Sequence, residues 1–550
     1  MQVWAQGVNF VALKPSAVDV SCTYVPYKET GYFSRLVTDY IDAHPGLGPL
    51  YNFAPDAAGI DAAIQARQQY PVNRQVLTET LKKQYATLPP HDAAARNLEL
   101  LGNDNCFTIC TAHQPNLMTG YLYFIYKIVH AIKLADELNT AHPGKHFVPV
   151  YYIGSEDNDL EELGTFRYGD KKYVWDAAGQ TGAVGRMDTA SLKPLVADLF
   201  KVLGPPGSNL DELKELVHNA YLGHKNIAEA TQYLVHGLFG RYGLVVLNPD
   251  EAAFKKSILH IIKDDLLNHT ANGIVAAQQE RFPEYKSQAY SRPVNLFYLD
   301  TQLRERIERD KDTWHVLNTE IALSEQELLN LLERHPERFS PNVILRGLLQ
   351  ETILPDVAFI GGGAEVAYWL QLKEVFAHYK VFFPAILLRQ SMLWIPAPQA
   401  ALRKKTGLSI GQLFIPTHEL EKAYVTEHGG ESWQTRAEME ALEQLMAQLE
   451  AKATAIDITL TSSAGAALAK IRHQVQVLEK KMLRAQKRKM KTELERIERL
   501  KARLFPNHSL QERTENAMGY LAQYGIGWLD TLLHATQPLK PAFAVVEEQE

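Results

Sequence analysis

Two apolar stretches of the chain each end in a cluster of polar side chains that could do chemistry. Residues 107–112 lead into His113, Gln114 and Asn116, and residues 147–154 lead into Glu156, Asp157, Asn158 and Asp159. If the two stretches are strands of one parallel sheet, both clusters line the crevice at the carboxyl ends of the strands, where such sheets bind ligands. Carboxylates there can bind an ammonium group, hold a metal ion or accept a proton from an amine. We therefore predict that Glu156, Asp157 and Asp159 are catalytic, with a solvated acidic loop as the alternative.

The first cluster lies where the pattern changes from a strand to a helix. At such a turn, imidazole and amide groups can meet phosphate at the amino end of the helix. Class I aminoacyl-tRNA synthetases and related nucleotidyltransferases have a similarly placed histidine signature, and the alternative is an ordinary polar turn. The residues predicted to bind substrate or nucleotide in this region are His113, Gln114, Asn116, Thr119, Gly120, Tyr123 and Asn158.

Three further groups of residues accompany strand-like segments. The glycines at 361–363 precede a helix and would let a ligand approach backbone amides, although tight strand-to-helix geometry explains them equally well. The arginine and serine at 389 and 391 could bind phosphate or carboxylate, with a surface arginine as the alternative. The polar block at 288–298 could line a pocket or simply edge a sheet. The residues predicted from these groups are Gly361, Gly362, Gly363, Glu365, Tyr368, Arg389, Ser391, Arg292, Asn295 and Tyr298.

Length and composition indicate a globular protein with more than one domain. The chain has 550 residues, which exceeds what one hydrophobic core usually supports. A net charge of -7 argues against nucleic-acid binding over the whole surface. Three cysteines without paired spacing predict neither a disulfide framework nor a zinc site. The first residues lack a signal-peptide pattern and no stretch of roughly 18 apolar residues occurs, so we expect a cytoplasmic protein without a membrane span.

The last third of the chain has the pattern of a coiled coil. Apolar residues at 439, 442, 446, 449, 453 and 456 alternate in spacings of three and four, and the rhythm recurs from 471 to 504 with a slip near 489. Residues 431–457 carry six acidic and two basic side chains, whereas 470–503 carry four acidic and thirteen basic. We predict an antiparallel hairpin whose leftover apolar residues, including Met490, Leu494 and Ile497, pair with a second copy. RNA binding by the basic helix is the disfavoured alternative.

The segment after these helices combines capping residues with polar groups. Ser509 and Glu512 are spaced to cap a helix, and this structural interpretation is favoured. Asn507, Gln511 and Arg513 could instead form a second nucleotide site.

Six segments occur together in the order seen in one family. They are residues 111–127, 153–162, 295–298, 339–346, 360–369 and 504–513. The chain thereby resembles the cysteine-adding ligase family of bacillithiol biosynthesis over about residues 25–540. The resemblance implies an α/β fold, a Rossmann-like parallel sheet core with connecting-peptide insertions similar to those of class I aminoacyl-tRNA synthetases, followed by a coiled-coil domain that forms a homodimer. On this plan the core spans 1–165 and 336–425, the insertions and returning strands span 166–335, and the coiled coil and tail span 426–550.

The resemblance also implies a reaction, in which L-cysteine is joined to the amine of glucosaminyl malate to give bacillithiol. A free carboxylate must be activated before it forms an amide, so ATP with Mg²⁺ is the expected cofactor, and the sequence leaves adenylate and acyl phosphate routes open. A carboxylate of the acidic cluster would take the proton of the attacking amine. Arg292 and Arg389 would hold malate or phosphate, because a guanidinium matches carboxylate geometry.

Two positions depart from the family pattern. Asn158 stands where histidine is usual, and Gly363 or its neighbour replaces a proline. Asparagine does not titrate near neutral pH, which argues against an acid or base role for position 158. The alternatives are another ATP-dependent amino-acid ligase or nucleotidyltransferase on the same core, and a coiled-coil RNA-binding scaffold. The polar clusters at the strand ends disfavour the scaffold.

Overall fold

The computed structural model describes residues 18–282, 284–429 and 434–549, which form two compact units. The first unit contains the described residues of Met1–Lys28, Tyr32–Trp394 and Ser509–Gln549, and the second contains those of Glu29–Gly31 and Ile395–His508. The sequence had placed the last boundary at 426 and had grouped the tail with the coiled coil. Residues 509–549 of this tail cluster with the first unit, in which strand β15 (Ala542–Glu548) pairs antiparallel with β1 (Val20–Pro26).

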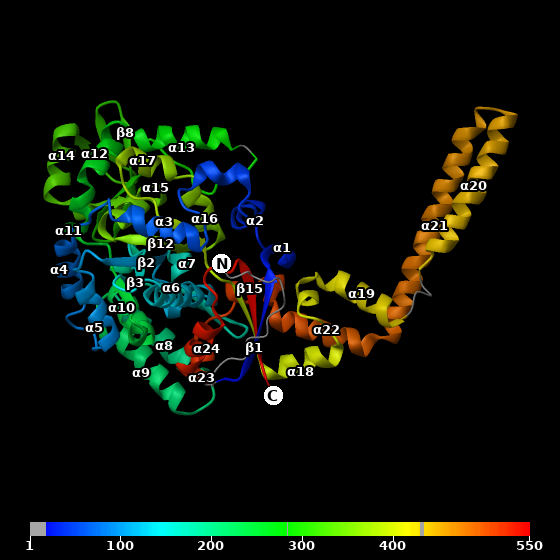
Figure 1. Ribbon diagram of the computed structural model, residues 1–550, viewed down its shortest axis with the longest axis horizontal. Coiled ribbons are helices and arrows are strands. Elements are labelled where there is room, and N and C mark those ends of the chain that lie inside the picture. The colour runs from blue at the N-terminus through cyan, green and yellow to red at the C-terminus, as the bar shows by residue number, and fades with distance from the viewer. Residues whose placement is uncertain (1–17, 283, 430–433, 550) are drawn as a thin grey trace. The chain divides into compact units, whose positions relative to one another are not determined.

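A five-stranded parallel sheet forms the centre of the first unit (Figure 1). Its strands are almost entirely buried, which explains their near-continuous apolar sequences. Helix α6 (Leu122–Ala141) connects β2 to β3 and packs on both. This alternation confirms the predicted Rossmann-like α/β core. The strands, in sheet order, are β13 (Ala385–Leu388), β12 (Asp356–Gly361), β2 (Cys106–His113), β3 (His146–Ile153) and β6 (Val245–Leu247).

The register of the sheet brings the polar clusters to one edge. His113, the last residue of β2, lies opposite Ile153, the last residue of β3. On the other side, Gly361 at the end of β12 lies opposite Leu388 at the end of β13. Because all four strands are parallel, the segments that follow them leave the sheet at the same edge. The predicted juxtaposition of the histidine turn and the acidic cluster is therefore confirmed, and the glycine turn joins them.

Smaller sheets surround this core. A five-stranded antiparallel sheet has the order β10-β9-β8-β7-β11, and a third sheet has the order β1-β15-β14. Strands β4 and β5 pair antiparallel and form a separate two-stranded sheet. The remaining strands are β4 (Thr165–Tyr168), β5 (Lys171–Val174), β7 (Leu296–Asp300), β8 (Leu303–Asp310), β9 (Thr313–Val316), β10 (Ala322–Ser324), β11 (Phe339–Pro341) and β14 (Met392–Ile395).

Helices account for most of the rest of the first unit. A capping box formed by Ser324 and Glu327 begins α14, and the helix predicted after the glycines at 361–363 is α16. None of the helices in residues 18–282, 284–429 and 434–549 is long and apolar enough to cross a membrane. The other helices of this unit are α2 (Arg35–Ile41), α3 (Ala57–Arg67), α4 (Arg74–Gln84), α5 (Asp92–Leu100), α7 (Leu160–Leu163), α8 (Lys193–Phe200), α9 (Ser208–Gly223), α10 (Ile227–Phe239), α11 (Ala252–Lys255), α12 (Leu259–Leu267), α13 (Thr270–Arg281), α14 (Glu325–Arg334), α15 (Val343–Ile353), α16 (Gly363–Leu370), α17 (Lys373–Tyr379), α23 (Met518–Tyr524) and α24 (Gly527–Ala535).

The second unit contains the predicted antiparallel hairpin, in which α20 (Arg436–Ile456) and α21 (Leu460–Lys489) run side by side (Figure 1). Arg472 of the basic helix pairs with Glu443 of the acidic helix at 2.6 Å, as charge complementarity predicts. The slip near residue 489 is a helix end, and α22 (Lys491–Leu504) follows it. The other helices of this unit are α18 (Ala397–Thr406) and α19 (Thr417–Gly429).

One expectation about this unit is wrong. Leu494 and Ile497 were expected to remain exposed for pairing with a second copy, but they are 7% and 0% exposed, respectively. Helix α22 packs against α18 and α19 of the same chain, and its apolar face is used there. The heptad pattern does not distinguish an intramolecular partner from an intermolecular one, because both bury the same apolar face.

Candidate active site

A cavity of about 820 Å³ lies at the carboxyl edge of the central sheet. Residues that follow β2, β3, β12 and β13 line it, together with residues of β7, β8 and α15. Eleven of the residues predicted from the sequence line this cavity: His113, Gln114, Tyr123, Asp157, Arg292, Gly362, Gly363, Glu365, Tyr368, Arg389 and Arg513. Within the described residues, the other predicted positions are outside its lining: Asn116, Thr119, Gly120, Glu156, Asn158, Asp159, Asn295, Tyr298, Gly361, Ser391, Asn507 and Gln511.

His113 ends β2 and packs edge-on against Tyr123, with the ring centroids 5.4 Å apart. Burial lowers the pKa of His113 well below its usual range, and the charges of Lys127 and Arg389 lower it further. The imidazole is therefore neutral at pH 7. Its Nε2 atom is buried and has no hydrogen-bond partner among the described residues. A neutral imidazole with one free ring nitrogen is suited to hydrogen-bond a ligand in the cavity.

The turn after His113 is shaped by backbone geometry and by the tail of the chain. Asn516 Nδ2 donates to the carbonyl oxygens of Met118, at 2.8 Å, and of Gly120. Gly120 has a φ of +62°, and a Cβ at this position would lie 2.9 Å from Cβ of Asn116. Asn116, Thr119 and Gly120 therefore form the turn that positions His113 and lie outside the lining of the cavity.

Asp157 is the carboxylate of the acidic cluster that lines the cavity. Gln114 Nε2 donates to Asp157 Oδ2 at 2.9 Å. Burial raises the pKa of Asp157, but the charge of Arg346, the hydrogen bond from Gln114 and the charge of Arg304 outweigh this effect and hold the pKa below its usual value. Asp157 is therefore ionised at neutral pH, where it can bind an ammonium group.

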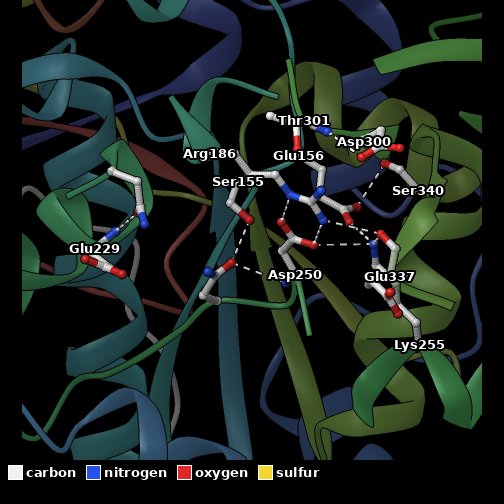
Figure 2. Close-up of polar contacts among 12 residues, drawn as sticks. Ser155, Glu156, Arg186, Glu229, Asp250, Lys255, Asp300, Thr301, Glu337 and Ser340 are labelled. Carbon is white, nitrogen blue, oxygen red and sulfur yellow. Dashed lines mark hydrogen bonds and ion pairs between the residues drawn. The ribbon is translucent and has the colours of Figure 1, made fainter. Parts of the chain in front are cut away.

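Glu156, which was predicted to be catalytic, belongs to a buried network of charges instead (Figure 2). Its carboxylate pairs with Lys255 and accepts a hydrogen bond from Ser340 Oγ at 2.9 Å. Lys255 also lies 3.5 Å from Asp250, which accepts two hydrogen bonds from Arg186 at 2.6 and 2.7 Å. The Glu156 side chain is thus occupied by the protein itself. Its contacts hold the loop after β3 in place.

The other members of the acidic cluster have different roles. Asp159 Oδ1 accepts a hydrogen bond at 3.1 Å from the backbone N–H of Glu162, so this exposed side chain caps α7. Asn158 Oδ1 accepts a hydrogen bond from Arg304 Nη1 at 3.0 Å, and Arg304 lines the cavity. Of the three carboxylates predicted to be catalytic, only Asp157 among the described residues reaches the cavity.

The glycine turn begins α16 and faces the histidine turn. Glu365 accepts a hydrogen bond from the backbone N–H of Gly362 at 2.7 Å and forms an ion pair with Lys127. Lys127 Nζ also donates to the carbonyl oxygen of Ala112 at 2.9 Å. A Cβ on Gly361 would lie 3.0 Å from Cβ of Glu365, so tight strand-to-helix geometry explains this glycine.

Arg389 is buried and neutralised. Its guanidinium donates two hydrogen bonds to the carboxylate of Glu512, at 2.7 and 2.8 Å, and one to Ser391 Oγ at 3.0 Å. Burial alone would lower the pKa of the Arg389 guanidinium, but the charge of Glu512 outweighs this effect and raises the pKa above its usual value. Arg389 therefore forms part of the cavity wall and ties the core to the tail.

The three residues proposed as a second nucleotide site have different surroundings. Gln511 forms hydrogen bonds at 2.9 and 3.1 Å with the backbone N–H and carbonyl of Trp394. Arg513 lines the main cavity, and Asn507 belongs to the second compact unit.

The 288–298 block contributes one arginine to the cavity. Arg292 is exposed and lines it. Asn295 is fully buried and donates to Asp265 from its side-chain amide at 3.0 Å. Tyr298 accepts a hydrogen bond from Arg338 Nη1 at 2.8 Å. Asn295 and Tyr298 therefore stabilise the segment around Arg292.

Four cations of the cavity were not predicted from the sequence: Lys127, Arg304, Arg306 and Arg346. Arg346 is the last residue of the segment 339–346, which carried part of the family resemblance, and its place there could have identified it as a site residue. The arginines at 304 and 306 alternate with a glutamate on β8, a pattern typical of an exposed strand. Among the described residues, no group of three or more His, Cys, Asp or Glu side chains could hold a metal ion.

Comparison with protein families supports the sequence resemblance. Residues 20–390 match the family model "Bacillithiol biosynthesis BshC, N-terminal Rossmann-like domain", and residues 392–548 match "Bacillithiol biosynthesis BshC, C-terminal coiled-coil domain". The chain belongs to the BshC family. The boundary between these two BshC domain models lies close to Trp394, where the first compact unit is interrupted.

Relatives in the BshC family align over nearly the whole chain. A protein of Flavobacterium psychrophilum is 38% identical over 95% of this chain and 99% of its own length. A protein of Cytophaga hutchinsonii is 36% identical over 90% of this chain and 93% of its own length. A protein of Salinibacter ruber is 29% identical over 97% of this chain and 100% of its own length. Each is named "Putative cysteine ligase BshC".

Proposed function

We propose that this chain is the ligase that joins the carboxyl group of L-cysteine to the amine of glucosaminyl malate, giving bacillithiol. The observation that carries the proposal is a cavity in which an ionised carboxylate, Asp157, lies among several cations. This arrangement suits a substrate that combines an amine with carboxylates. The names of the BshC relatives support the choice of cysteine as the second substrate.

Asp157 has two successive roles in this proposal. Its negative charge first binds the protonated sugar amine. Once one proton has passed to solvent, the neutral amine nitrogen bonds to the activated carbonyl carbon of cysteine, the activating AMP or phosphate leaves as that C–O bond breaks, and the Asp157 carboxylate accepts the second N–H proton. Gln114 donates to one oxygen of Asp157 and orients the carboxylate for this transfer. The lowered pKa of Asp157 keeps the carboxylate charged and favours binding of the amine.

ATP would supply the activation of the cysteine carboxyl group, with Mg²⁺ accompanying its phosphates. The cavity offers groups that fit a nucleotide: the unpartnered Nε2 atom of His113 and the guanidinium of Arg513. Arginine and neutral imidazole both donate hydrogen bonds to phosphate oxygens. We assign these two residues to the nucleotide.

Thiol profiling of cells that lack this protein tests the function. The deletion should remove bacillithiol and accumulate glucosaminyl malate, and the wild-type gene should restore the thiol.

Asp157→Asn should lower bacillithiol at least about a hundredfold, since general base catalysis contributes 10²–10⁴-fold. Asp159→Asn is the matched control, because Asp159 belongs to the same loop and caps α7. Unchanged thiol in the deletion strain, or full restoration by Asp157→Asn, would contradict the proposal.

We also propose that the α20–α21 hairpin holds a homodimer. Leu445, Leu449 and Leu478 on this hairpin are 53%, 46% and 53% exposed, and a second copy could bury them. Leu445→Glu with Leu449→Glu should reduce the mass measured by light scattering to that of one chain, 62.0 kDa. Ala447→Glu, an exposed site on the opposite side of α20, is the control and should leave the dimer intact. A wild type that is monomeric at micromolar concentration would refute this interface.

A further inference from the structure

Arg304 and Arg346 form a pair of guanidiniums in the cavity wall. Arg304 is 6% exposed and stacks on the ring of Phe297, with 3.8 Å between the guanidinium carbon and the ring centroid. Asn158 Oδ1 accepts a hydrogen bond from its Nη1 atom at 3.0 Å. The Nε atom of Arg304 is buried without a hydrogen-bond partner among the described residues. Stacking and the bond to Asn158 thus fix the orientation of a guanidinium that still has unused donors.

Neither arginine forms an ion pair within the described residues, although the charge of Asp157 acts on Arg304. Arg389 and Lys127 in the same cavity have ion pairs with Glu512 and Glu365. By contrast, no ion pair joins Arg304 or Arg346 to a carboxylate within the described part of the chain. Burial and the like charge of Arg346 lower the pKa of Arg304 to about 10, which leaves it charged at pH 7. Arg304 is buried and Arg346 is half-buried, and because native proteins pair their buried charges, the two guanidiniums are suited to bind an anion from outside the chain.

We propose that Arg304 and Arg346 bind the dicarboxylate end of the amine substrate. This inference rests on the proposed function, because it assigns the malate carboxylates of that substrate to a place in the same cavity. Each guanidinium can donate two parallel hydrogen bonds to one carboxylate. Two guanidiniums therefore match two carboxylates.

The position of the pair next to Asp157 favours the sugar substrate over the phosphates of a nucleotide. Asp157, Arg304 and Arg346 line the same cavity, and the charges of both guanidiniums help to hold the pKa of Asp157 below its usual value. Glucosaminyl malate carries its amine and its carboxylates in one small molecule, and adjacent sites of opposite charge would bind both ends at once. This geometry would also direct the amine to Asp157, since the carboxylates fix the other end of the substrate.

Titration calorimetry of the full chain with free malate and with inorganic phosphate, at constant ionic strength, tests the assignment without requiring catalysis. Malate should bind, and Arg346→Met should weaken this binding about tenfold or more through the loss of a charge-assisted contact. Arg346→Lys keeps the positive charge but loses the planar guanidinium, so its malate affinity should lie between those of the wild type and Arg346→Met. Asn158→Ala should also weaken malate binding, because it frees Arg304 without removing its charge. Arg334→Met is the control, since Arg334 is exposed on α14, outside the cavity.

Two results would overturn the assignment. One is malate affinity in Arg346→Met and Asn158→Ala equal to that of Arg334→Met, with all variants melting at the wild-type temperature. The other is phosphate binding that is tighter than malate binding and depends on Arg346, which would assign the pair to the nucleotide. Failure of the proposed function is a separate outcome. In that case malate binding would still depend on Arg346, while cells lacking the protein would retain bacillithiol.

Discussion

Removing the negative charge of Glu512 should loosen the attachment of the tail to the core. The Glu512 and Arg389 side chains are 0% and 6% exposed and share two hydrogen bonds at 2.7 and 2.8 Å. Glu512→Gln leaves the Arg389 guanidinium buried without a counter-ion, and breaking a buried ion pair in this way costs about 3–5 kcal/mol. That is a large fraction of the roughly 5–15 kcal/mol by which a domain is stable.

Hydrogen exchange measured by mass spectrometry suits this test, because it reports local opening without assuming that both units unfold together. Since each 1.4 kcal/mol is a factor of ten, protection of the peptide around Glu512 should fall by about two to three orders of magnitude. The double variant Arg389→Met with Glu512→Met is the control, because apolar residues of similar volume can replace a buried pair at little cost. Wild-type protection in Glu512→Gln, or equal losses in the single and double variants, would refute the reasoning.

Two further predictions concern stability. Ile497→Glu should abolish the hydrogen-exchange protection of α22, because Ile497 is 0% exposed. The substitution removes about 1.5–3 kcal/mol of apolar burial and places a charge in the core. Leu478→Glu, at an exposed site, should leave α22 protected, and equal protection in both variants would show that α22 does not pack within its own unit. Burial lowers the pKa of His130 to about 3, and the charge of Arg389 adds to this effect. The His130 side chain therefore stays neutral in the folded state, whereas in the unfolded state it binds a proton below about pH 6.5. The stability that His130 contributes is therefore fully present above that pH and is lost as the pH falls. In His130→Asn the melting temperature should drop less steeply between pH 7.5 and 5.5 than in the wild type. The Asn amide oxygen can still accept the hydrogen bond that the backbone N–H of Gln390 donates to Nδ1 of His130 at 2.9 Å, and an identical slope in the two proteins would contradict this prediction.

Several features of this protein were determined by the sequence alone, because they depend on local patterns. Strand-like apolar runs that end in polar clusters predicted which edge of the sheet carries the site, and the β2-β3 register confirmed that edge. The heptad spacing and the opposite charges of the two segments predicted the α20–α21 hairpin, and the ion pair of Arg472 with Glu443 agrees with that charge pattern. These predictions succeeded because a strand end or a helix face is set by residues that are close in the chain.

The partners of the site residues were decided only by the tertiary structure. Glu156 and Asp157 are neighbours in the chain, but Glu156 pairs with Lys255, whereas Asp157 lines the cavity. Arg304 lies on a strand whose alternating charges are typical of an exposed edge, yet it lines the cavity and donates a hydrogen bond to Asn158 in the loop after β3. Arg389 meets Glu512, which is 123 positions away. Contacts of this kind join distant segments, so composition and spacing carry no signal for them, and the fold alone decides which charges are neutralised and which remain free for a ligand.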